Sequence, residues 1–180
     1  MLYKEKDEYK LIDTPVKGSP YSCPLRGRPG AIATIHMHPQ GSGPSLQDLI
    51  HLLYLLKLSD GEIKDSFIAA NTGKKYNLHI TDTAKANQFY QSFNTTTGKN
   101  SLKDLLQQYA EVQEQQRKEV DGEFHEHEYH LFAMALLLRE KDSGVVLTEM
   151  NMESFEQLDA WIIEKEGQRI KKIMKTRCKY

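Results

Sequence analysis

Two histidines and an aspartate stand close together in the segment IHMHPQGSGPSLQD, residues 35–48. On a strand, His36 and His38 point to the same side, while Met37 faces the other way, into packing. A loop of turn-forming residues follows, and Asp48 returns on the first turn of an expected helix. Two imidazole nitrogens and one carboxylate oxygen form a ligand set of catalytic zinc, which keeps its fourth position for water. The spacing therefore predicts a zinc centre at His36, His38 and Asp48.

The chemistry expected of such a centre is hydrolysis. Zinc lowers the pKa of its bound water toward ~7, so hydroxide is available at neutral pH. Ser45 lies on the same helical turn as Asp48, where its hydroxyl can donate a hydrogen bond to the oxyanion formed when hydroxide attacks a carbonyl. A purely structural interpretation also exists, because His-x-His pairs arise by chance and Ser-x-x-Asp caps helices. The strand, loop and helix order favours the metal site.

The residues HMHP, the glycine-rich loop and the Ser-x-x-Asp pair resemble the JAMM signature of the MPN or JAB metallopeptidase family. The resemblance implies that Zn²⁺ is bound by His36, His38 and Asp48, and that Ser45 supports the oxyanion. It implies a peptidase or isopeptidase in which a zinc-bound water attacks an amide carbonyl. The implied partner is a peptide or protein substrate, such as a ubiquitin-like or C-terminal tail. The loop between His38 and Ser45 is one residue shorter than is usual in the family.

A glutamate on an earlier strand is the general acid/base of that family. Upstream of the motif the chain has four acidic residues, Glu5, Asp7, Glu8 and Asp13. Glu5 is the best candidate among them; the alternative is a glutamate before Met1, in sequence missing from this chain. Two interpretations stay open, an active hydrolase and an inactive MPN-like scaffold that binds a partner. A third is a helical binding module in which the histidine pair is incidental.

The expected fold is a mixed α/β or α+β sheet flanked by helices, because strand and helix patterns are interleaved. Strands are expected as a pair within 1–18, with a charged turn at Glu5–Glu8, and at 31–37, 66–70, 75–80 and 145–149. Helices are expected at 45–60, 82–93, 101–120, 123–141 and 154–174. Residues 1–100 are predicted to form a JAB/MPN-like metal-binding core. Residues 101–180 are predicted to form a helical extension with one late strand, packed on the same domain.

The composition excludes few functions, but it argues against nucleic acid and membranes as partners. The 180 residues carry 24 basic and 25 acidic side chains, a net charge of -1, so nucleic acid is not expected as a partner. No stretch is apolar and long enough to span a membrane, and the charged N-terminus does not resemble a secretion signal. Cys23 and Cys178 match no metal or redox spacing, which favours a reducing, cytoplasmic location. The alternative is a domain of a larger exported bacterial protein. The oligomeric state is not predicted.

A second histidine cluster, HEHEYH at His125–His130, does not fit a zincin site. That site needs histidines four residues apart on a helix, and Tyr129 occupies the required position. Glutamates and histidines at helical i, i+4 spacing indicate a solvated face with weak ion pairs. The polar helix at 101–120 has few apolar residues and is a candidate docking surface.

Overall fold

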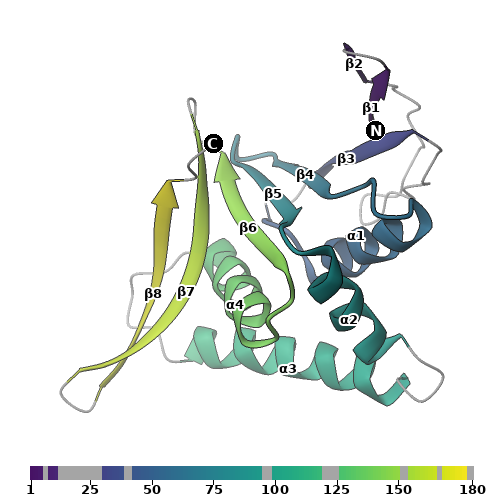
Figure 1. The fold of residues 1–180 in the computed structure, drawn as a ribbon. Coiled ribbons are helices and arrows are strands. Elements are labelled where there is room, and N and C mark those ends of the chain that lie inside the picture. Colours follow the sequence, from purple (N-terminus) through teal and green to yellow (C-terminus); the bar gives the residue numbers. More distant parts are fainter. Residues whose placement is uncertain are drawn as a thin grey trace.

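The computed structural model describes residues 1–5, 8–11, 30–38, 42–94, 99–118, 126–150, 154–165 and 168–177. These residues form one eight-stranded sheet with the strand order β2-β1-β3-β4-β5-β6-β7-β8, together with four helices (Figure 1). The strands are β1 (Leu2–Glu5), β2 (Glu8–Leu11), β3 (Ala31–His38), β4 (Asp65–Ala70), β5 (Lys75–Ile80), β6 (Val145–Met150), β7 (Phe155–Lys165) and β8 (Gln168–Arg177). The helices are α1 (Leu46–Leu58), α2 (Thr83–Phe93), α3 (Lys99–Lys118) and α4 (Glu126–Glu140). The mixed sheet with helices confirms the predicted mixed α/β class, and an MPN-like arrangement within that class stays a prediction.

The sheet is mixed because β3 and β4 are parallel, whereas the other neighbouring pairs are antiparallel. Parallel neighbours need a crossover connection, and α1 supplies it between β3 and β4. The C-terminal end of β3 therefore lies close to the N-terminal end of α1. These are the two places where the sequence puts His36, His38 and Asp48.

The described helices cover one face of the sheet. On β4, the alternate residues Ser66, Ile68 and Ala70 are buried. His36 and His38 lie opposite Ile68 and Ala70 in the parallel register, so the two histidines belong to the covered face. Met37 points to the other face, as predicted. Its packing prediction is wrong, because 67% of its surface is exposed.

Helix α1 begins with a capping box. The Ser45 hydroxyl accepts from the backbone N–H of Asp48, and the Asp48 carboxylate accepts from the backbone N–H of Ser45. This arrangement satisfies backbone donors that have no partner inside the helix. Six leucines of α1 are buried in the core: Leu46, Leu49, Leu52, Leu53, Leu55 and Leu56. The cap and the buried leucines together fix where Asp48 lies.

The predicted last helix at Ser154–Met174 is wrong. The structure has two antiparallel strands there, β7 and β8, so the part after residue 100 contributes three strands to the sheet instead of one. The apolar residues of this segment fit a helical spacing, but they include Trp161, Ile162 and Ile163, which favour strands. Hydrogen bonds from β6 to β7 decide the outcome, since a strand continues the sheet. The turn sequence around Gly167 is the signal that sequence reasoning passed over.

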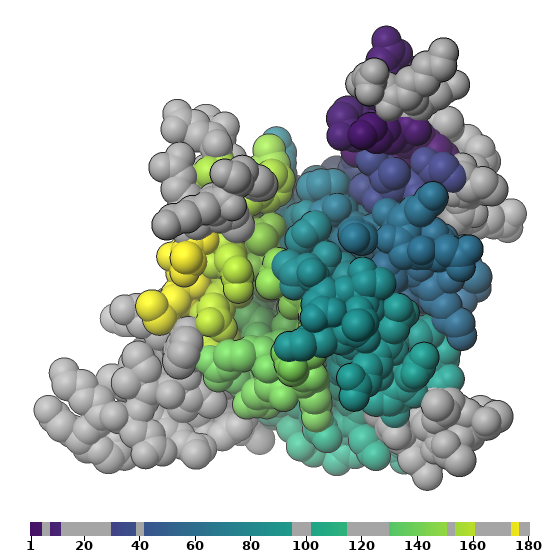
Figure 2. Space-filling model, viewed as in Figure 1, coloured from purple at the N-terminus to yellow at the C-terminus, as the bar shows by residue number. Residues whose placement is uncertain are grey.

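Helices α3 and α4 pack against each other and close the covered side of the core. Residues 131–138 of α4 are all buried, and α3 contributes Leu105 and Tyr109. In Figure 2 the teal and green atoms of these helices lie at the opposite end of the molecule from the purple atoms of β1 and β2. Within the described part of the chain, no helix has the length and apolar character to cross a bilayer.

Candidate metal centre

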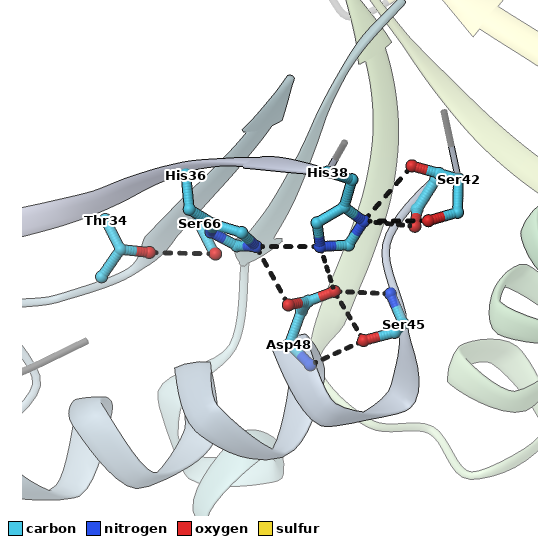
Figure 3. A network of polar contacts seen from close by, with 8 residues as sticks. Thr34, His36, His38, Ser42, Ser45, Asp48 and Ser66 are labelled. Atoms are coloured by element: carbon cyan, nitrogen blue, oxygen red, sulfur yellow. Dashed lines mark hydrogen bonds and ion pairs between the residues drawn. The ribbon is translucent and has the colours of Figure 1, made fainter. Parts of the chain in front are cut away.

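Three side chains from β3 and α1 converge on one point (Figure 3). His36 Nε2 lies 3.2 Å from His38 Nε2 and 3.0 Å from Asp48 Oδ1. His38 Nε2 lies 3.4 Å from Asp48 Oδ2. All three side chains are largely shielded from solvent, with 9%, 16% and 13% of the surface of His36, His38 and Asp48 exposed. The structure thus brings the three predicted ligands together.

These separations fit a tetrahedral metal ion. Zinc lies about 2.0–2.1 Å from histidine nitrogens, so two ligand atoms on a tetrahedron are about 3.3–3.4 Å apart. In this cluster the two Nε2 atoms are 3.2 Å apart, and each lies near its own oxygen of Asp48, Oδ1 at 3.0 Å from His36 and Oδ2 at 3.4 Å from His38. Nitrogen and carboxylate donors also suit other divalent transition metals, so the donor set limits the metal to a class.

The orientation of His38 suits a metal ligand. Its Nδ1 lies 3.1 Å from the Gly43 carbonyl oxygen and 3.3 Å from that of Ser42. The Ser42 hydroxyl also lies 3.3 Å from Nδ1. The two carbonyl oxygens only accept hydrogen bonds and the hydroxyl can accept as well, so this set of neighbours favours the proton on Nδ1. In the neutral ring, Nε2 then keeps its lone pair, and this atom faces His36 and Asp48. Ligating histidines are commonly oriented in this way by a second hydrogen bond.

Asp48 divides its two carboxylate oxygens between the helix cap and the cluster. Oδ2 accepts from the Ser45 amide at 2.6 Å and from the Ser45 hydroxyl at 2.7 Å. Oδ1 lies by His36 Nε2. Ser45 therefore lies beside the cluster, as predicted, but its hydroxyl donates to Asp48. Its predicted role as an oxyanion donor requires the hydroxyl to turn away from that carboxylate.

Asp48 is held as an anion. Burial raises the pKa of its carboxyl, but the hydrogen bonds with His36 and His38 outweigh burial and bring the pKa far below its usual range. The hydrogen bond with Asp48 raises the pKa of His38 above its ordinary value of 6.5, against the opposing effect of burial. The cluster therefore has a strong preference for positive charge next to Asp48. A divalent cation satisfies this preference.

The second ring nitrogen of His36 is in a different situation. Its Nδ1 is buried and has no hydrogen-bond partner among the described residues. Next to it on the same face, the hydroxyls of Thr34 and Ser66 share a buried hydrogen bond of 2.9 Å (Figure 3). His36 is therefore oriented through its Nε2 contacts, whereas His38 is oriented from both sides of its ring.

Glu5, the candidate general acid/base, is not brought to the cluster. Its backbone lies at the end of β1, opposite Glu8. Strand β1 is antiparallel to β3 with Leu2 opposite Ala33, so β1 runs away from His36. At about 3.3 Å per residue along a strand, this register separates the backbones of Glu5 and His36 by roughly 20 Å. No fourth histidine, cysteine or acidic side chain joins the cluster within the described ranges.

The other residues considered at the sequence level lie elsewhere or outside the described residues. His125, Cys23 and Cys178 belong to the undescribed part of the chain. His130 contacts α3, where Gln113 Nε2 donates to its Nδ1 at 2.5 Å. His79 pairs with Asp65 at 2.8 Å on the open face of the sheet.

Two neighbours of the cluster were missed by sequence reasoning. Leu131 of α4 packs on Gly43, and Tyr109 of α3 is close enough to Asp48 for the carboxylate charge to act on its phenol. Both residues follow the motif by more than 60 positions, and their apolar spacing indicates only a helix face. No local signal in the sequence connects them to the histidines.

Comparison of this chain with models of protein families, with curated proteins and with solved structures gives no match. The inference of function therefore starts from the chemistry of the cluster.

Proposed function

We propose that this chain is a zinc-dependent hydrolase of the peptidase or isopeptidase type. The observation that carries the proposal is the convergence of His36, His38 and Asp48 at separations that fit a tetrahedral metal. Zinc bound by such residues supplies a nucleophile at neutral pH and a positive charge for a developing oxyanion. The resemblance of the segment to the JAMM signature supports amide bonds as the target.

Each residue of the motif has a distinct role in this proposal. The two histidines and Asp48 hold the metal, and the carbonyls of Ser42 and Gly43 keep the His38 ring in the ligating tautomer. Ser45 positions Asp48 in the resting state through two hydrogen bonds. When a substrate carbonyl develops negative charge, the hydroxyl of Ser45 can turn to donate to it.

A second candidate function is a metal-binding scaffold without catalysis. It is favoured by the strand register that leaves Glu5 roughly 20 Å from His36, since a hydrolase of this kind uses a carboxylate to carry the proton. In this alternative the same three ligands bind zinc and stabilise the fold, and a partner protein binds the chain. The two functions share the metal site and differ in turnover.

Turnover separates the two candidates. The zinc-loaded protein is incubated with a mixture of peptides and with an isopeptide-linked substrate, and products are identified by mass spectrometry. A hydrolase releases products, loses them in the His36→Ala/His38→Ala variant and slows in Ser45→Ala. Zinc binding without any product supports the scaffold. Absence of metal binding contradicts both candidates.

A further inference from the structure

Ser42 and Gly43, shortly before α1, contact a predicted metal ligand through their backbone. His38 Nδ1 donates toward the carbonyl oxygens of Ser42 and Gly43, at 3.3 and 3.1 Å. These two carbonyls set the rotation of the imidazole, and thereby the direction of Nε2.

Gly43 packs closely against Leu131 of helix α4. A Cβ atom placed on Gly43 would lie only 2.6 Å from Leu131 Cδ2 and 3.2 Å from Leu131 Cγ. The same position is 3.7 Å from the ring of Tyr76 on β5. Gly43 itself is buried and its φ is not positive, so close approach and not backbone strain explains the glycine. Leu131 thus packs directly on the backbone that holds His38.

Leu131 is in turn fixed by α3. The residue before it, His130, accepts a hydrogen bond at its carbonyl from the Tyr109 hydroxyl at 3.4 Å, and at its Nδ1 from Gln113 at 2.5 Å. Tyr109 is itself buried, so this hydrogen bond is shielded from solvent. The first described turns of α4 are held in place on the side of the metal centre.

We infer that Leu131 is a positioning residue for the metal centre, which supports the Gly43 backbone so that His38 points its Nε2 at the metal. The inference rests on the proposed metal binding and extends it to the part of the chain beyond the motif. A continuous series of contacts joins α3 to the centre: Tyr109 and Gln113 bond to His130, the neighbouring Leu131 packs on Gly43, and the Gly43 carbonyl contacts His38. The α3–α4 pair is thus a structural part of the centre.

Metal affinity of a matched pair of variants tests this role. Leu131 and Leu136 lie on the same helix, and each has 4% of its surface exposed. Leu131→Ala and Leu136→Ala are expected to lose similar stability, since both remove the same buried atoms. Zinc affinity is measured by competition with a chromophoric chelator. Loss of support around a ligand weakens metal binding about 10–100-fold, so we expect this for Leu131→Ala and less than about 2-fold for Leu136→Ala.

A rescue experiment distinguishes direct support from general loosening. Gly43→Ala puts a methyl group where Leu131 lies and is expected to weaken zinc binding as well. In Gly43→Ala/Leu131→Ala the new methyl enters the space that the leucine leaves. The double variant should therefore bind zinc more tightly than the sum of the single effects allows, which is the mark of two residues in contact.

The outcomes are separable from those of the proposed function. If the natural protein binds zinc and Leu131→Ala binds it as tightly as Leu136→Ala, the positioning role is overturned. Additive effects in the double variant also overturn it. If the natural protein binds no zinc, the proposed function fails, and the inference fails with it. Should Leu131→Ala not fold, Gly43→Ala alone still tests whether the loop controls affinity.

Discussion

Replacing Asp48 by asparagine separates metal binding from helix capping. The carboxylate has two tasks, because Oδ2 closes the capping box and Oδ1 faces His36. An asparagine oxygen can still accept from the Ser45 amide, so the cap is largely kept. The loss of a helix cap costs about 1 kcal/mol at most sites, and Asp48→Asn should avoid most of that cost. The lost negative charge should remove most of the metal affinity.

The expected size of the effect follows from linkage. At a free zinc concentration 100 times its Kd, binding stabilises the folded state by about 2.7 kcal/mol. In a chain of this size each kcal/mol raises the Tm by about 2–4 °C. Zinc should therefore raise the Tm of the natural protein by about 5–11 °C. The same zinc concentration should raise the Tm of Asp48→Asn hardly at all.

Thermal unfolding with and without zinc is the assay, and a second capping aspartate gives the control. Asp82 caps α2 by accepting from the Lys85 amide, and it has no part in the cluster. Asp82→Asn should keep the full zinc-dependent rise in Tm. An equal rise in Asp48→Asn and the natural protein would refute Asp48 as a metal ligand.

Three further predictions concern pH and packing. Zinc affinity should fall as the pH drops through the pKa of His38, which Asp48 raises above 6.5, because protons then compete with zinc for the ring nitrogen. Calorimetric titration with zinc at several pH values measures this, and an affinity that does not fall would contradict His38 as a ligand. The hydrogen bond that His79 donates to Asp65 is the largest cause of the raised pKa of His79, so this pair stabilises the fold fully below about pH 6.5 and loses that contribution as the pH rises through the higher folded-state pKa. Urea unfolding of the natural protein and His79→Gln should therefore converge at high pH, and a constant difference would count against the pair. Gly144 has φ +67, and a Cβ there would lie 2.4 Å from the Asp82 carbonyl oxygen. Gly144→Ala should therefore lower the free energy of unfolding by about 2–4 kcal/mol, and a loss under about 1 kcal/mol would contradict the close approach.

The cluster of His36, His38 and Asp48 could be predicted because it depends on local interactions. The alternation of His36 and His38 on a strand, and the Ser45 and Asp48 capping box, involve residues close in sequence. Hydrophobic period and turn residues also placed the β4–β5 hairpin, α2 and β6. Each of these predictions rests on interactions within one element or one turn.

What escaped prediction depends on distant parts of the chain. The segment that forms β7 and β8 fits a helical spacing, and pairing with β6 makes it a strand. Met37 was expected to pack, but the structure leaves its face of β3 open. The contact between Leu131 and Gly43 joins residues that only the folded sheet and helices bring together.

Metal content is the most direct test of the central claim. The protein, purified without a histidine tag, is loaded with zinc, freed of excess metal and measured by elemental analysis beside His36→Ala/His38→Ala. The variant His51→Ala/His79→Ala removes two histidines outside the cluster and controls for nonspecific binding. We expect one zinc per chain in the natural protein and in the control, and none in the His36→Ala/His38→Ala variant. Equal zinc in all three proteins, or zinc in none, would contradict a metal centre at His36, His38 and Asp48.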